Sequence, residues 1–276
     1  MGTLGDFLRT RRGRLRPEDA GITSYGARRV PGLRREELAQ LAGVSATYYT
    51  RLEQGQSHQA SWSVVEALAD TLRLSQDERA YLHRLARPEP QRRSVAKPAS
   101  ARAGTRQLLA ALTDVPAVVV GVRTEVLAWN ALGHRLLAGH VDFSAPDRPD
   151  ERPNLTRMLF LDAHYAALHP DWPVTASCAV ASLRITAARL PDDVALAELV
   201  GELTMKSEAF AALWASHPVA NHAFGPRRLR HPEVGELELE LETAELPDGH
   251  HLVLYSAAAD SPAHSALRLL KLVPTR

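Results

Sequence analysis

Apolar residues in the first 86 positions of the chain recur at spacings of three and four, which is the period of helices with one buried face. A Ser-Gln-Asp-Glu run, typical of a capping box, opens the last of these periodic segments. A long connection rich in Gly and Pro separates the first segment from the second. The pattern predicts an all-α domain of five helices, at residues 4–8, 34–42, 46–53, 65–72 and 75–85.

The pattern changes in the second part of the chain, where strands flank a run of helices. Two short segments, 117–122 and 125–128, predict strands, the first because it is β-branched and apolar. Further on, "GELELELETAEL" alternates between leucine and glutamate, which is typical of an antiparallel strand with one exposed face. "RRLRH" before it and "HHLVLYSA" after it predict its two neighbours. Helices are expected between the two groups of strands, at residues 129–138, 155–161, 174–190, 194–202 and 207–214.

This order of elements predicts a multidomain protein with an all-α part and an α+β part. A chain of 276 residues has room for two hydrophobic cores. The stretch at 87–104 holds three prolines, five basic residues and one large apolar residue, so it cannot bury enough surface to fold. We therefore predict an N-terminal domain at 1–87, a linker at 88–104, and a second domain at 105–276 with an antiparallel sheet and inserted helices.

The second and third predicted helices are joined by a turn of about three residues. Gly43 stands where the earlier helix must end in the left-handed conformation, and Ser45 is suited to cap the next. Such a tight turn sets the helices at a steep angle. The outer face of the later helix carries Thr47, Tyr48 and Arg51, whose side chains can bond base edges and phosphates. The pattern favours a helix that reads DNA.

The residues around this turn resemble a known family. "REELAQLAGVSATYYTRLEQG" is similar to the phage-repressor type of helix-turn-helix, the XRE family. Segments on either side and far downstream resemble the subset of that family joined to an MmyB-like ligand-binding domain. These segments include "RRVPGLRREELA", "ERAYLHRLA", "NLTRMLFLD" and "LVGELTMKSEAFAALWASHPV". The resemblance covers nearly all of the chain.

The resemblance implies which residues meet DNA. Base-edge contacts would fall on Ala46, Thr47 and Arg51, with Tyr48 close by. Ala46 offers only an apolar contact, so polar readout would rest on Thr47 and Arg51. One such helix reads few base pairs, so we expect a homodimer on two half-sites about 34 Å apart. The resemblance also places a phosphate contact at Arg35, and Arg28, Arg29 and Arg34 of the long loop are further candidates.

Charge is segregated along the chain in a way that agrees with a nucleic-acid partner. Residues 1–104 hold 18 Lys and Arg against 11 Asp and Glu, a net of +7, whereas the remainder holds 15 against 21, a net of −6. A basic module on a nearly neutral protein is typical of polyanion binding. With no secretory signal and no apolar stretch near the roughly 20 residues that span a bilayer, we expect a soluble, cytoplasmic protein.

For the second domain the resemblance implies a PAS-like fold with a five-stranded antiparallel sheet, and a fatty acid or similar amphiphile as ligand. A pocket of this kind combines apolar walls with a few polar anchors. Arg184 is the most informative candidate, because a charge amid alanine and leucine either reaches solvent or meets an anion such as a carboxylate. The candidate ligand-binding residues are Trp129, Asn130, Phe160, Trp172, Arg184, Trp214 and His231. In the alternative interpretation the aromatic residues are core, and the domain only dimerises or binds a partner protein.

No motif in the sequence indicates an enzyme or a metal site. The sequence lacks H-E-x-x-H, a paired cysteine set, G-x-S-x-G and a glycine-rich phosphate loop. The histidines do not indicate a catalytic site, since several of them precede a proline in turn-like contexts. The single cysteine, Cys178, is interpreted as core filler. We therefore expect no catalytic residues, no metal and no cofactor apart from a bound fatty acid or similar apolar ligand.

Overall fold

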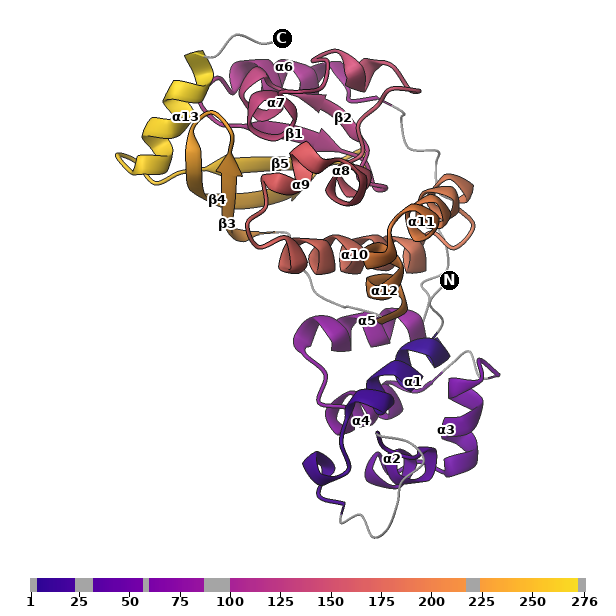
Figure 1. The fold of residues 1–276 in the computed structure, drawn as a ribbon. Helices are drawn as coiled ribbons and strands as arrows, with labels where there is room; N and C mark the ends of the chain where they lie inside the picture. Colours follow the sequence, from indigo (N-terminus) through magenta and orange to yellow (C-terminus); the bar gives the residue numbers. More distant parts are fainter. Residues whose placement is uncertain (1–3, 23–31, 57–59, 87–99, 217–223, 273–276) are drawn as a thin grey trace.

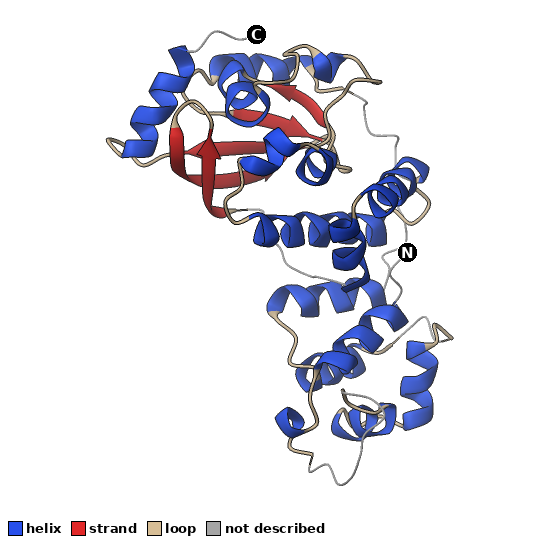
Figure 2. Ribbon diagram, viewed as in Figure 1, coloured by secondary structure: helices blue, strands red, loops and turns tan. Residues whose placement is uncertain are grey.

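The computed structural model describes residues 4–22, 32–56, 60–86, 100–216 and 224–272. Figure 1 shows a helical N-terminal domain at one end and a sheet-containing domain at the other, with α10 (Trp172–Arg189) lying between them. Figure 2 shows that the strands of the described ranges all belong to the C-terminal domain. None of the helices in these ranges is long and apolar enough to cross a membrane.

The N-terminal domain contains the five predicted helices, and a 3₁₀ turn follows the first. The capping box is confirmed, because the Ser75 N–H donates to the Glu78 carboxylate (2.8 Å) and the Glu78 N–H donates to the Ser75 hydroxyl (3.2 Å). The elements are α1 (Leu4–Arg14), η1 (Glu18–Ala20), α2 (Arg35–Leu41), α3 (Ala46–Glu53), α4 (Trp62–Thr71) and α5 (Gln76–Ala86).

The core of this domain is built from the periodic apolar positions of all five helices. Phe7 and Tyr81 meet edge to face with ring centroids 5.3 Å apart, and Tyr49 and Leu52 are fully buried. Helix α1 approaches the end of α3 so closely that a Cβ on Gly5 would lie 2.1 Å from a backbone carbonyl oxygen of α3. Only glycine fits this contact, which fixes α3 on the domain.

The C-terminal domain contains a five-stranded antiparallel sheet in the order β2-β1-β5-β4-β3. Two strands precede the helical middle and three follow it, as the sequence predicts. The predicted alternation is also confirmed, since Leu237 and Leu239 are buried while the neighbouring glutamates are exposed. The strands are β1 (Ala117–Val120), β2 (Val126–Trp129), β3 (Gly225–His231), β4 (Gly235–Glu245) and β5 (His251–Ser256).

Helices cover both faces of the sheet. One face, with Val118, Leu239 and Tyr255, packs against the helical middle and the last helix; the other, with Val119 and Leu252, is covered in part by the first helix of the domain. Three helices, α6, α9 and α13, were not predicted. The helices are α6 (Ala103–Ala111), α7 (Ala131–Ala138), η2 (Ala145–Asp147), α8 (Leu155–Leu161), α9 (Ala163–Ala167), α10, α11 (Val194–Lys206), α12 (Glu208–Ser216) and α13 (Pro262–Leu272).

The boundary between the domains was predicted as a linker at 88–104, most of which lies outside the described residues. Where the description resumes, Ala101 is buried and α6 begins at Ala103, packed beside β2. Residues from Ala101 onward therefore contribute to the core of the C-terminal domain.

The two domains meet where α10 packs on α5, as Figure 1 shows. Ile185 and Ala188 of α10 extend the apolar core of the N-terminal domain. Arg184, 1% exposed, lies over the Trp214 ring at 4.2 Å, donates to the Trp214 carbonyl oxygen and hydrogen-bonds Tyr81 of α5. The contact therefore combines apolar packing with one buried cation.

Candidate functional site

The turn between α2 and α3 has the geometry that its sequence predicts. Gly43 adopts a φ of 66°, and the Val44 N–H donates to the Ala39 carbonyl oxygen at 2.9 Å to close the end of α2. The Ser45 hydroxyl accepts from the Tyr48 N–H at 3.1 Å and so caps α3. The turn is therefore held at both ends by local hydrogen bonds.

The outer face of α3 is open. Ala46 and Thr47 are exposed in its first turn, Arg51 is exposed one turn further on, and Tyr48 is half-buried against the domain core. Within the described ranges the Arg51 guanidinium makes no hydrogen bond or ion pair. An N-terminal helical turn with polar, unengaged side chains is the part of a recognition helix that reaches base edges in the major groove.

The base of α3 is anchored by a buried carboxylate. Glu53, 2% exposed, accepts from Arg12 Nε at 3.0 Å and Nη2 at 2.7 Å, and it also accepts from Arg35. The hydrogen bond from Arg35 to Glu53 raises the pKa of that guanidinium. Glu53 therefore has a structural role, since it ties α1 and α2 to the end of α3.

The predicted phosphate-contacting arginines differ in their surroundings. Arg35 is bonded to Glu53 and keeps 42% of its side chain exposed. Arg34 is exposed, and its N–H donates to the Glu37 carboxylate at 2.7 Å where α2 begins. Arg28 and Arg29 lie outside the described residues. Arg34 and Arg35 thus stand near the start of α2, a helix terminus that favours anions.

A cavity of about 510 Å³ lies between the inner face of the sheet and the helices α8, α9 and α10. Its walls are largely apolar, with Val120 and Leu241 from the sheet and Leu159 from α8. At one end it reaches the N-terminal domain, because Asp77 and Ala80 of α5 also line it. The volume falls within the about 300–1,000 Å³ that small-molecule pockets occupy.

Polar groups gather in one part of this cavity. The Tyr165 and His169 rings meet edge to face with centroids 5.0 Å apart. The His169 Nε2 is enclosed and has no hydrogen-bond partner among the described residues. Burial, reinforced by the charge of Arg227, lowers the pKa of His169 to about 4, so its imidazole is neutral at pH 7. Burial raises the pKa of Tyr255 to about 12, which keeps that hydroxyl protonated.

The positive charge of this part comes from Arg227 on β3. Alternate residues of a strand share a face, and Arg227 stands two positions before Leu229, which is 1% exposed. Across the sheet Arg227 pairs with Leu239, which is also buried. Arg227 therefore lies on the inner face of the sheet, where it is half-buried and its Nη1 donates to the Pro226 carbonyl oxygen at 2.9 Å.

The seven residues expected to bind the ligand do not line this cavity. Two of them, Trp129 and Asn130, line a smaller hollow of about 430 Å³ near α6 and α7. The side-chain oxygen Oδ1 of Asn130 accepts from the N–H groups of Gly133 (2.7 Å) and Ala117 (3.1 Å), so Asn130 caps α7 and joins it to β1. The Trp129 indole donates to the Phe143 carbonyl oxygen at 2.8 Å.

Four more of the seven pack the helical middle or close a turn. Phe160 meets Trp172 edge to face at 5.5 Å, and the Trp172 indole donates to a backbone carbonyl oxygen of α8 at 3.0 Å. Trp214 stacks on Phe210 at 5.7 Å. The His231 Nε2 lies 3.0 Å from the carbonyl oxygen of Arg135. The polar side-chain atoms of Trp172 and His231 are thus engaged by the fold.

Arg184, the seventh candidate, is buried between the domains. The groups it faces are the Trp214 ring, the Trp214 carbonyl oxygen and Tyr81, and it does not line the cavity. Burial lowers the pKa of its guanidinium, with Tyr81 acting against this. The structure therefore assigns Arg184 to the contact between α10 and α5.

Comparison with known protein families agrees with these features. Residues 3–82 match the family described as "Helix-turn-helix domain", and residues 101–270 match "MmyB-like transcription regulator ligand binding domain". The fold and the open helix α3 are thus those of a ligand-responsive transcription regulator. The chain belongs to the MmyB-like family, with a helix-turn-helix domain of the XRE type. A search of curated proteins gave no match.

Sequence reasoning missed the polar part of the cavity. Arg227 stands in "PRRLRH", where period-two alternation places it on the same face as Leu229 and His231. That alternation was a usable signal for an inward arginine. No comparable signal marks Tyr165 or His169, because Tyr165 lies on α9, which has only five residues and no recognisable period, and His169 lies just beyond its end.

Proposed function

We propose that this protein is a sequence-specific DNA-binding regulator whose C-terminal cavity takes a carboxylate-bearing amphiphile, such as a fatty acid. The main support for this proposal is the cavity itself, which has apolar walls, an inward arginine and a rim supplied by α5 of the DNA-binding domain. A ligand in this position touches both domains.

The chemistry of the cavity favours a carboxylate head. Arg227 supplies a permanent positive charge on the inner face of the sheet, and a guanidinium forms charge-assisted hydrogen bonds with a carboxylate. His169 and Tyr255, both neutral at pH 7, add hydrogen-bonding groups that do not repel the anion. The hydrocarbon tail then lies along the apolar wall formed by Val120, Leu159 and Leu241.

Occupancy of the cavity is coupled to DNA binding through α10 and α5 in this proposal. Ile185 of α10 lines the cavity and packs on the N-terminal core at the same time. Ala80 of α5 borders the cavity one residue before Tyr81, which bonds Arg184. A ligand that binds one packing of α10 on α5 more tightly than another shifts the protein toward that packing. The size of the shift is set by the ratio of its affinities for the two packings, and the shift changes the population of DNA-binding conformations.

The DNA is a double-stranded operator read by Thr47 and Arg51, with Ala46 and Tyr48 beside them and Arg34 and Arg35 on phosphates. We propose a two-fold homodimer, because one recognition helix contacts too few base pairs to select a site in a genome. The PAS-like character of the C-terminal domain belongs to the same proposal and is supported by the strand order β2-β1-β5-β4-β3.

The ligand class is tested by displacement of a fluorescent fatty acid from the full-length, delipidated protein. Straight-chain acids of increasing length should bind more tightly by about fourfold per methylene, since each buried methylene contributes about 0.8 kcal/mol, until the cavity is full. Absence of displacement by every chain length excludes a fatty acid as the ligand.

A further inference from the structure

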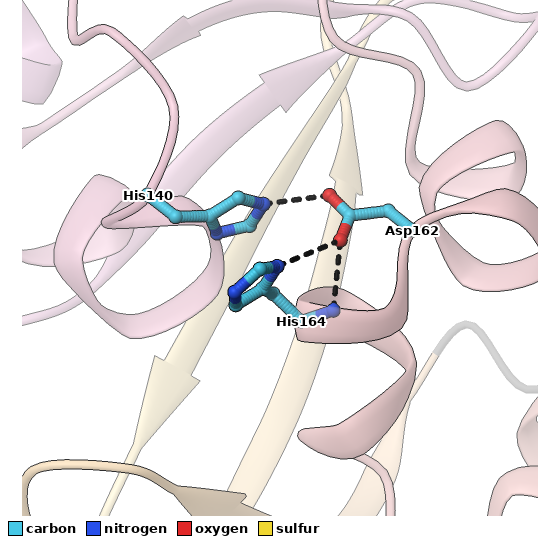
Figure 3. Close-up of side chains that lie close together, drawn as sticks. All are labelled: His140, Asp162 and His164. Atoms are coloured by element: carbon cyan, nitrogen blue, oxygen red, sulfur yellow. Dashed lines mark hydrogen bonds and ion pairs between the residues drawn. The ribbon is translucent and has the colours of Figure 1, made fainter.

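A cluster of His140, Asp162 and His164 lies outside both the recognition helix and the cavity. His140 follows the end of α7, Asp162 stands between α8 and α9, and His164 is in the first turn of α9. Figure 3 shows both imidazole rings pointing toward the one carboxylate. One potential ligand atom from each residue lies within 4.8 Å of the other two.

The carboxylate is held in place by the backbone. The Asp162 Oδ1 accepts from the N–H groups of His164 at 2.8 Å and Tyr165 at 3.3 Å, which makes Asp162 the cap of α9. Its Oδ2 lies 2.6 Å from His140 Nε2. Burial tends to raise the pKa of Asp162, but the bonds from His140 and the backbone outweigh it and lower that pKa. The carboxylate is thus ionised at neutral pH.

The two imidazoles are arranged as a pair. Their rings stack with centroids 4.9 Å apart and an angle of 22°, and His164 Nδ1 lies 3.6 Å from Asp162 Oδ1. Hydrogen bonding to the carboxylate accounts for the position of His140, yet His164 is drawn toward the same group although 77% of its side chain is exposed. The two imidazole nitrogens therefore face the two oxygens of one ionised carboxylate, at a place that solvent can reach.

We propose that His140, Asp162 and His164 bind a Zn²⁺ ion. Imidazole nitrogen and carboxylate oxygen are ligands that Zn²⁺ prefers, at about 2.0–2.2 Å, which separates two donors of a tetrahedral ion by about 3.4 Å. Donors already within 4.8 Å reach this geometry by small side-chain rotations. Three protein ligands leave the fourth position for water.

The ion would join the end of α7 to the start of α9. Because α9 also carries Tyr165, which lines the cavity, the bound metal would fix one wall of that cavity. The site needs neither DNA nor an amphiphile, so it can be tested independently of the proposed function. Its residues are spaced by 22 and 2 positions, a pattern that no common metal motif uses.

The test is a Zn²⁺ titration of the tag-free, full-length protein against a chromophoric chelator, after removal of bound metal. The variants are His164→Ala and Asp162→Asn, and the control is His264→Ala on α13. His164 is exposed and asparagine can still cap α9, so both variants should keep the fold, which circular dichroism checks.

We expect one Zn²⁺ per chain and a loss of affinity of at least about tenfold in each site variant, because even outer-shell substitutions cost about 10- to 100-fold. The control should bind like the wild type, and Co²⁺ should give the visible absorption of a four-coordinate site. Absence of binding would show that the cluster is only a hydrogen-bonded and stacked group. Equal binding by wild type and both site variants would place the metal elsewhere.

Discussion

Replacement of the inward arginine of β3 by glutamine, Arg227→Gln, is the sharpest test of how the cavity recognises its ligand. Glutamine is shorter but keeps a polar, hydrogen-bonding side chain and removes the charge. The matched control is Arg230→Gln on the same strand, because position 230 is exposed on the opposite face and its charge pairs with Glu236 at 3.6 Å. Both variants lose one charge, and only one of them loses it inside the cavity.

The magnitude follows from the type of hydrogen bond that the substitution removes. A hydrogen bond to a charged group contributes about 1.5–3 kcal/mol, and about 1.4 kcal/mol corresponds to a tenfold change in Kd. Arg227→Gln should therefore weaken the binding of a fatty acid by about tenfold to a hundredfold, whereas Arg230→Gln should leave Kd within about twofold because an exposed ion pair contributes little.

The assay is competitive displacement measured with each acid and with the alcohol of the same chain length. The alcohol lacks the anion, so wild type should prefer the acid and Arg227→Gln should lose that preference. If Arg227→Gln weakens the acid and the alcohol equally, the arginine supports the cavity wall and does not recognise a carboxylate. If Arg230→Gln weakens the acid as much as Arg227→Gln does, the effect comes from general charge and the cavity assignment is wrong.

Three further predictions concern the recognition helix and the stability of the fold. Arg51→Ala should weaken binding to a selected operator by about five- to a hundredfold and leave binding to non-specific DNA nearly unchanged. The control, Arg9→Ala on α1, should not weaken operator binding selectively. Anisotropy titrations with both kinds of DNA measure these affinities. His169 has its pKa lowered from 6.5 to about 4, so between these values the unfolded chain binds a proton that the folded chain does not, and stability falls as the pH falls. In His169→Phe the loss of unfolding free energy between pH 7 and pH 4.5 should be smaller than in the wild type by up to about 3 kcal/mol. Urea unfolding at the two pH values measures this loss, and an equal loss in the variant and the wild type would refute the prediction. Gly5→Ala should destabilise the N-terminal domain by about 1–3 kcal/mol because its Cβ would overlap backbone, whereas Gly13→Ala in the same helix has open space around it and should not.

Periodicity predicted the elements of the fold well where one face of a long element is buried. The five N-terminal helices and the leucine–glutamate alternation of β4 both follow this rule. The same method missed α6, α9 and α13. Helix α9 has five residues, too few to show a helical period, and α6 begins inside a stretch whose composition resembles a linker.

The candidate ligand residues were harder to predict because aromatic type and burial do not specify which space a side chain borders. Phe160 and Trp214 lie in apolar helical patterns, and their placement depends on packing among α8, α10 and α12 that one-dimensional patterns do not contain. Arg184 was correctly singled out as unusual, and it is buried, but its partners come from α12 and from the other domain. A contact between residues more than a hundred positions apart has no local signal.

The most direct test of the account is the binding of the purified protein to an operator selected from random duplexes. Binding is measured by fluorescence anisotropy at two salt concentrations, with and without a long-chain fatty acid below its critical micelle concentration. We predict specific, salt-sensitive binding whose Kd the acid shifts by at least about fivefold, with the shift abolished in Arg227→Gln. Specific binding that no amphiphile changes would contradict the proposed control by ligand, and absence of specific DNA binding would contradict the account as a whole.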